Sequence, residues 1–213
     1  MPLLSETYAL FDSADLDVTI DGFEDLIHYT DESDNPQQGT IWFGSLGSGG
    51  ADTDDRVAQA QSDPGVDQIT LTVAYILGQW TAATNYSIGD CVEPITPNGY
   101  RYRVTTDGGS SHATTEPTWP TTIGATVVDQ DLVWTCVSAK HEVTEVTLAL
   151  TEGDLDINTP GAALDIGASI ESGTANGVEI WWRIENNVNT VSNNTSTPEL
   201  ALQLNAFVEL ENL

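Results

Sequence analysis

Basic residues are scarce in this sequence. The chain of 213 residues holds five Lys and Arg against 33 Asp and Glu, so its formal net charge is −28. Nucleic-acid binding depends on Lys and Arg that neutralise phosphates, and anionic membrane surfaces attract the same residues. We therefore expect no nucleic-acid partner and no membrane partner. The acidity itself fits three explanations, which are solubility at high local concentration, cation binding and a basic partner.

Cysteine and histidine are also rare, with two and three residues. Cys91 and Cys136 form no Cys-x-x-Cys pair, and too few histidines lie near them for a zinc site. Two interpretations stay open for this pair. If their strands are neighbours, a disulfide that closes about 45 residues adds ~4 kcal/mol through loop entropy. Otherwise both are buried thiols in a reduced compartment.

The sequence has neither an export signal nor a long apolar run. Residues 1–6 lack a basic start and a continuous apolar stretch. No segment approaches the ~18 apolar residues of a membrane span. We expect synthesis in a cytosol, with no export through a cleaved N-terminal signal.

No catalytic motif is visible. His28, His112 and His141 lie far apart, Ser45 does not lie in a nucleophile elbow, and there is no phosphate loop. The count of carboxylates leaves a pair for glycoside hydrolysis open, but none lies in a recognisable catalytic setting. We predict that the protein is not an enzyme and holds no cofactor.

Two acidic turns, residues 31–35 and 52–55, contain oxygen ligands of the kind that calcium prefers. Neither has the full spacing of a twelve-residue calcium loop. We predict solvated loops and no metal site, with calcium binding as the weaker alternative.

The sequence does contain many segments in which apolar and polar residues alternate, which is the period of a half-buried strand. Strands are predicted over residues 16–20, 23–29, 40–43, 68–75, 145–150, 163–170, 178–184 and 200–210. Residues 44–55 are rich in Gly and Asp and predict an exposed loop. Residues 56–61 predict one or two helical turns.

Short strands separated by Gly, Pro and Asn turns predict an all-β fold, specifically an antiparallel β-sandwich. The last strand needs apolar partners from residues before Trp80 and after His141. We therefore predict one discontinuous sandwich from residues 1–78 and 140–213, with residues 79–139 inserted as a small β-rich module.

Residues 80–137 differ from their flanks, because they hold both cysteines and three of the six tryptophans. Gly89-Asp90 predicts a tight turn and Asn98-Gly99 a hairpin, since Asn-Gly tolerates positive φ. Residues 100–104 and 132–136 predict strands. In so small a unit most aromatic rings are needed for the core.

The module resembles known families. The pattern Trp80, Tyr86, Gly89-Asp90, Val92, Gly99, Tyr100, Pro117 and Trp134 is similar to chitin- and cellulose-binding modules of bacterial glycosidases. Residues 80–137 resemble more closely a carbohydrate-binding-type insert of tailed-phage structural proteins, which carries the same Asn-Gly-Tyr-Arg-Tyr and Glu-Pro-Thr-Trp-Pro segments. The flanks, especially residues 161–181, also look like such virion proteins.

The resemblance implies a non-enzymatic virion protein, most simply a capsid decoration or auxiliary protein made in the host cytoplasm. Its partners would be other virion proteins, further copies of itself and a cell-surface glycan. Chitin-binding modules place an exposed aromatic pair after the second hairpin strand, where this chain has Thr105-Thr106-Asp107-Gly108. The remaining candidates for glycan contact are Trp119, which two prolines flank, then Tyr100 and Trp80.

Three alternatives remain open at the level of function. One is a neck or tail structural protein, and another is a sugar-binding accessory module of a secreted glycosidase. The third is an assembly part whose insert binds nothing.

Overall fold

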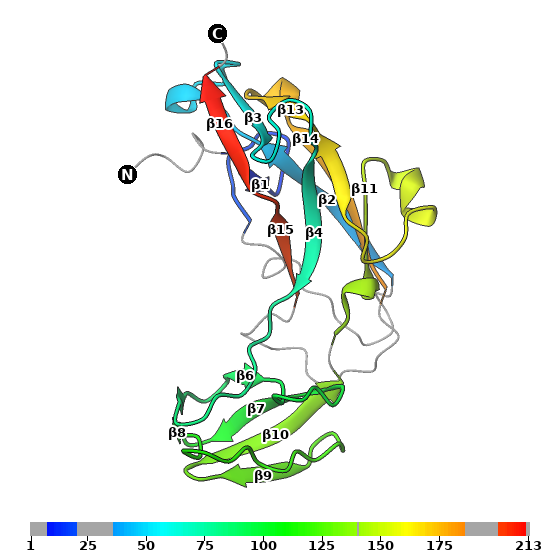
Figure 1. Ribbon diagram of the computed structural model, residues 1–213. Coiled ribbons are helices and arrows are strands. Elements are labelled where there is room, and N and C mark those ends of the chain that lie inside the picture. Colours follow the sequence, from blue (N-terminus) through cyan, green and yellow to red (C-terminus); the bar gives the residue numbers. More distant parts are fainter. Residues whose placement is uncertain (1–7, 21–35, 140, 186–199, 212–213) are drawn as a thin grey trace.

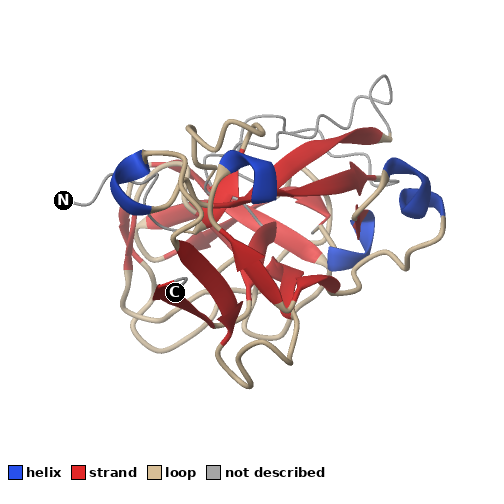
Figure 2. Ribbon diagram, turned by 90° about the horizontal axis from the view of Figure 1, so that it is seen from above, coloured by secondary structure: helices blue, strands red, loops and turns tan. Residues whose placement is uncertain are grey.

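The computed structural model describes residues 8–20, 36–139, 141–185 and 200–211. These residues form the predicted all-β fold, in which every described pair of strands is antiparallel. The helices in this part of the chain are short 3₁₀ turns, and Figure 2 shows strands as the dominant element. They are η3 (Ser48–Gly50), η4 (Val143–Glu145), η5 (Glu152–Asp156) and η6 (Thr174–Asn176).

One layer of the sandwich is a four-stranded sheet with the order β1-β2-β14-β11. Its strands are β1 (Ala9–Phe11), β2 (Gln37–Gly44), β14 (Val178–Ile184) and β11 (Val146–Ala149). β2 and β14 are the long central pair and stay in register from Phe43 opposite Val178 to Gln37 opposite Ile184. The predicted strands at 40–43, 145–150 and 178–184 all lie in this sheet.

The second layer consists of two three-stranded sheets, ordered β12-β4-β15 and β13-β3-β16. The strands are β3 (Arg56–Ala60), β4 (Ile69–Tyr75), β12 (Leu164–Gly167), β13 (Ser169–Glu171), β15 (Leu200–Leu204) and β16 (Phe207–Glu211). β12 runs directly into β13, and β15 runs almost directly into β16. β3 and β4 are therefore two halves of one central strand, interrupted by residues 61–68.

Residues 61–68 form an exposed excursion out of this central strand. The carbonyl of Asp63 accepts hydrogen bonds from the N–H groups of Val66 (3.1 Å) and Asp67 (2.9 Å). Asn205 fixes the base, because its side chain accepts from Thr70 N–H at 2.9 Å and donates to the carbonyl of Gln68 at 3.2 Å. The looped-out segment thus has its own hydrogen bonds while the strand continues on either side.

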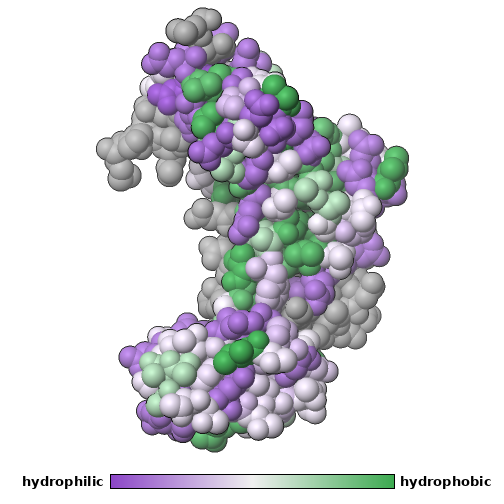
Figure 3. Space-filling view, viewed as in Figure 1, coloured by the Kyte–Doolittle hydropathy of each residue, from purple (hydrophilic) through white to green (hydrophobic). Residues whose placement is uncertain are grey.

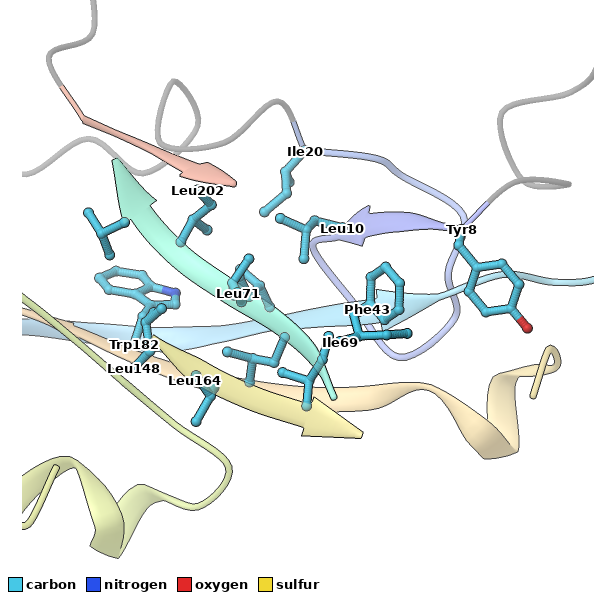
Figure 4. Packing of buried hydrophobic residues seen from close by; sticks show 14 of the residues in the cluster. Tyr8, Leu10, Ile20, Phe43, Ile69, Leu71, Leu148, Leu164, Trp182 and Leu202 are labelled. Carbon is cyan, nitrogen blue, oxygen red and sulfur yellow. The ribbon is translucent and has the colours of Figure 1, made fainter. Parts of the chain in front are cut away.

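The two layers bury one apolar cluster between them, drawn in Figure 4. The four-stranded sheet contributes Ile41, Phe43, Ile180 and Trp182, among others, and the second layer contributes residues such as Ile69, Leu71 and Ile170. Every buried member of the cluster comes from residues before Trp80 or after His141. Apolar burial drives this packing at about 25 cal/mol per Å².

The segment from Trp80 onward packs around a separate core. Figure 1 shows this segment as a distinct lobe beyond the lower end of β4. Its main sheet has the order β6-β7-β10-β9, and β5 pairs with β8 beside it. The strands are β5 (Asn85–Tyr86), β6 (Cys91–Val92), β7 (Tyr100–Thr106), β8 (Gly109–Ser110), β9 (Thr126–Asp129) and β10 (Leu132–Ala139). The buried core residues are Trp80, Val92, Tyr102, Val104, Leu132, Trp134 and Cys136.

Two predictions of local structure were wrong. Residues 16–20 form only an isolated bridge between Phe11 and Thr19, because Leu16 turns to a φ of 53° and is fully buried. Its side chain fills the space beside Gly44, where an added Cβ would meet Leu16 Cδ1 at 2.8 Å. Residues 56–60 are strand β3 and not a helix, because β13 and β16 pair with them on both sides.

Two long predicted strands are each divided. The run 163–170 separates into β12 and β13 at Gly167, whose φ is 143°. The run 200–210 separates into β15 and β16 at Asn205 and Ala206. Both breaks lie opposite the excursion in the central strand, so one feature explains them. The predicted strand at 23–29 lies outside the described residues.

Cys91 and Cys136 are free thiols, and both are buried. They lie on the two neighbours of β7, with Cys91 opposite Arg103 and Cys136 opposite Tyr102. Two strand spacings separate them, about 9.6 Å, against a usual disulfide limit of ~7 Å between Cα atoms. Arg103 and Tyr102 also point to opposite faces of the sheet. The disulfide interpretation was therefore wrong, and the buried-thiol interpretation describes the structure.

Candidate functional site in the inserted module

The centre of the module is a carboxylate that binds two tryptophans. Asp129 Oδ2 accepts hydrogen bonds from Trp80 Nε1 at 2.8 Å and from Trp134 Nε1 at 3.1 Å. Its Oδ1 accepts from the backbone N–H of His112 at 2.8 Å. Asp129 is only 3% exposed, so three donors compensate the burial of its charge. Asp129 thus connects Trp80, at the start of the module, to the hairpin of β9 and β10 at its end.

Trp80 therefore has no free ring face for a sugar. It is 3% exposed, and its one polar atom is bonded to Asp129. Stacking on a sugar needs an exposed ring face. The expectation that Trp80 contacts a glycan does not agree with this burial, and Trp80 is a core residue.

Trp119 lies half-buried at the surface of the same core. Its ring centroid is 4.4 Å from that of Tyr102 and 5.7 Å from that of Trp134. Its Nε1 donates to Glu116 Oε1 at 2.7 Å, and the same oxygen accepts from Ile95 N–H at 2.8 Å. The indole is thus held in one orientation while part of its surface stays open to solvent.

The residue beneath Trp119 is itself fixed. Tyr102 is fully buried, and its hydroxyl donates to the carbonyl of Pro120 at 2.8 Å and accepts from Asn98 Nδ2 at 2.7 Å. Burial raises the pKa of the Tyr102 phenol, and the hydrogen bond from Asn98 opposes that rise. The proline after Trp119 therefore has a specific role, since its carbonyl anchors the loop to β7.

Tyr100 lies two residues before Tyr102 on β7 and shares its face of the sheet. Its side chain is partly buried and packs against the module core, and its N–H donates to Asn98 Oδ1 at 3.1 Å. Tyr100 and Trp119 thus both lie beside Tyr102. Trp80 is instead bonded to Asp129 in the buried centre of the module.

Sequence reasoning did not single out Tyr86 as a rim residue. Its half-buried ring meets Trp134 edge-on at 5.0 Å, and its hydroxyl accepts from Thr81 N–H at 2.9 Å. Trp134 therefore contacts two partly exposed rings, Tyr86 and Trp119. No pattern in the sequence distinguishes Tyr86 at the rim from Trp134 in the core, because both rings lie on strands.

The acidic turn at 52–55 uses its carboxylates to hold the loop. Asp55 Oδ1 accepts from Ser48 N–H at 3.0 Å and from Thr53 Oγ1 at 2.8 Å, and these bonds lower the pKa of Asp55 to about 2. Asp52 accepts from the N–H and the hydroxyl of Thr174. Within the described residues no three His, Cys, Asp or Glu side chains gather as a metal site. The turn at 31–35 lies outside those residues.

The described part of the chain contains no helix of the length and apolarity needed to cross a membrane. A scan of protein families, a search of curated proteins and a search of solved structures each found no match to this chain.

Proposed function

We propose that this chain is a non-enzymatic structural protein of a tailed-phage virion, displayed as a decoration or auxiliary protein on the capsid. The sandwich docks on the particle, and the inserted module faces outward to touch a surface glycan. A neck or tail position is the close variant. The sequence resemblance of residues 80–137 and of the flanks supports the class of protein, and the setting of Trp119 supports the contact.

The observation that carries the glycan proposal is the fixed, partly open indole of Trp119. Glu116 orients its N–H and Tyr102 supports one side of the ring, so little side-chain freedom is lost when a sugar stacks on the remaining surface. Tyr100 lies two residues from Tyr102 on β7, packs against the same core and is partly exposed. Each contact is weak, and many copies on one particle would supply avidity through effective concentration.

The distribution of charge supports the proposed orientation. Residues 79–139 hold six acidic and two basic residues, a net charge of −4, which leaves −24 for the rest of the chain. Figure 3 shows the most hydrophilic colours mainly on the sandwich and paler colours on the module. Cell surfaces are commonly anionic, so the weakly charged module approaches them against less repulsion than the sandwich.

Retention on insoluble polysaccharides and glycan arrays tests the contact. Trp119→Ala is expected to weaken binding about tenfold, which corresponds to ~1.4 kcal/mol of lost stacking. Thr118→Ala is the matched control, because its exposed side chain is adjacent and lies outside the aromatic cluster. Equal retention of the two variants, with both modules folded, would remove Trp119 from the site.

Addition of purified protein to capsids that lack it tests the virion role. Co-sedimentation with capsids supports the decoration proposal, and binding to isolated tails or necks supports the variant. A protein that ignores all virion parts would refute both. A protein that decorates capsids but retains no glycan would indicate an assembly part whose insert binds nothing.

A further inference from the structure

Residues 200–211 form one long edge of the sandwich. β15 pairs with β4 and β16 pairs with β3, and each is the last strand of its sheet. Figure 1 shows the two strands following one another along this side. No described residue pairs with the outer side of either strand. An open edge presents unpaired N–H and C=O groups and is a template for another strand.

This edge lacks two of the devices that commonly prevent such pairing, which are proline and basic side chains. Residues 200–211 contain no proline, no lysine and no arginine. Each strand keeps an unshifted register with its neighbour. The opposite situation is seen at β11, where Gly161 N–H donates to the carbonyl of Val146 at 2.7 Å and Asn158 Nδ2 donates to that of Leu148 at 2.8 Å. That edge is covered by its own loop, whereas no backbone group of the described residues bonds to the outer side of β15 or β16.

The hydrogen bonds reveal which backbone groups face outward. Asn205 N–H donates to the carbonyl of Thr70 at 3.0 Å, and the carbonyl of Ala206 accepts from Gln61 N–H at 3.0 Å. Both residues therefore direct their backbone groups into the sheet. Consecutive residues of a strand alternate in this respect. The residues whose backbone groups point away from the sheet are consequently Leu200, Leu202, Leu204, Phe207, Glu209 and Glu211.

We propose that this edge pairs antiparallel with the same edge of a second copy of the chain, about a two-fold axis between Asn205 and Ala206. Leu204 then lies opposite Phe207 of the partner subunit. Leu202 lies opposite Glu209 of the partner subunit, and Leu200 lies opposite Glu211 of the partner subunit. In this register each outward backbone group meets an outward backbone group, and no carboxylate faces another carboxylate.

The side chains at this edge also benefit from a partner. Leu200, Leu204 and Phe207 pack against the sandwich core but remain partly exposed. They lie on the same face as Leu202, which is buried in that core. A second edge extends the core over them and adds apolar cross-strand pairs. The inference does not depend on the virion or glycan role, because it concerns only how two copies meet.

Sedimentation and light scattering over a range of protein and salt concentrations test the pairing. The molar mass is expected to double from the 22.8 kDa of one chain. Salt should favour the dimer, since it screens repulsion between two chains of −28. A mass of one chain under all conditions would overturn the proposal.

Two lysine variants separate this edge from other surfaces. Leu204→Lys places a charge where the partner's Phe207 would pack, and it is expected to raise the dimer dissociation constant at least about tenfold. Ile157→Lys is the control, because it makes the same change of an apolar residue to lysine at an exposed position that follows η5 and lies outside this edge. Equal dimerisation of both variants would place the contact elsewhere and overturn the proposed register.

A disulfide trap tests the register without disturbing the core. Gln203 would lie opposite Val208 of the partner subunit in a pair without hydrogen bonds, about 4.5 Å between Cα atoms, which suits a disulfide. Within one chain the same two positions are ~16 Å apart. The double variant Gln203→Cys with Val208→Cys is expected to form a disulfide-linked dimer, and each single variant is not. Failure of the folded double variant to cross-link would overturn the proposal.

Discussion

The substitution Asp129→Ala tests whether one buried carboxylate holds the module together. It removes the acceptor of two indole N–H groups and of the backbone N–H of His112, and both indole rings are buried. Each buried donor left unpaired costs about 1–3 kcal/mol, so the combined loss is roughly 3–6 kcal/mol after allowing for relaxation. A unit of this size has a total stability of about 3–9 kcal/mol. We expect the module of Asp129→Ala to be largely unfolded while the sandwich stays folded.

The assay is urea unfolding followed by two-dimensional NMR, in which the indole N–H signals of Trp80 and Trp134 report on the module. Signals of Ile180 and other sandwich residues report on the second core. Asp131→Ala is the control, because Asp131 is exposed and its carboxylate accepts a long hydrogen bond from the Gln130 side chain, at 3.4 Å. Asp129→Asn should have an unfolding free energy between those of the wild type and Asp129→Ala, because its amide NH₂ must face at least one of the three donors. An unfolding free energy for Asp129→Ala within ~1 kcal/mol of the wild type would refute the reasoning.

Two further changes follow from the structure. Burial raises the pKa of the Cys136 thiol, so the folded module keeps a proton that the unfolded chain releases. The stabilisation from this proton is complete below the ordinary thiol pKa of ~8.5 and is lost as the pH rises above it. The urea midpoint of the module should therefore decline between pH 7 and 9.5, and it should decline less in Cys136→Ala. An identical dependence of the urea midpoint on pH in the two proteins would contradict this. Asn205→Ala removes the hydrogen bonds to Thr70 N–H and Gln68 O at the base of the excursion. It should lower the unfolding free energy of the sandwich by about 1–2 kcal/mol, and Asn205→Asp, which keeps the acceptor, by less; an unchanged urea midpoint for Asn205→Ala would count against this clamp.

The strands that sequence reasoning placed correctly are those whose alternation reports a single buried face. Val178, Ile180, Trp182 and Ile184 follow the period of two, and the structure buries Ile180, Trp182 and Ile184 against the core. Turns at Gly89 and Gly99 were also predictable, since both need positive φ, at 99° and 83°. These are local properties, because they depend on residues within one strand or one turn.

Residues 56–61 illustrate why other features could not be predicted. Val-Ala-Gln-Ala has a composition that suits a helix, yet β13 and β16, more than 100 residues away along the chain, force an extended backbone. The excursion at 61–68 then decides where the runs 163–170 and 200–210 break. Propensity is a weak prior, and long-range pairing overrides it.

The aromatic module shows the same division between sequence and tertiary structure. The sequence by itself determined that the chain is an acidic all-β protein and that residues 80–137 concentrate its aromatic rings. Only the tertiary structure decided that Trp80 is buried and donates a hydrogen bond to Asp129, and that Trp119 lies at the rim. It also decided that Cys91 and Cys136 lie on opposite faces of one sheet. The physical reason is that periodicity fixes which side of a strand a residue occupies, whereas burial depends on what the rest of the chain packs against that side.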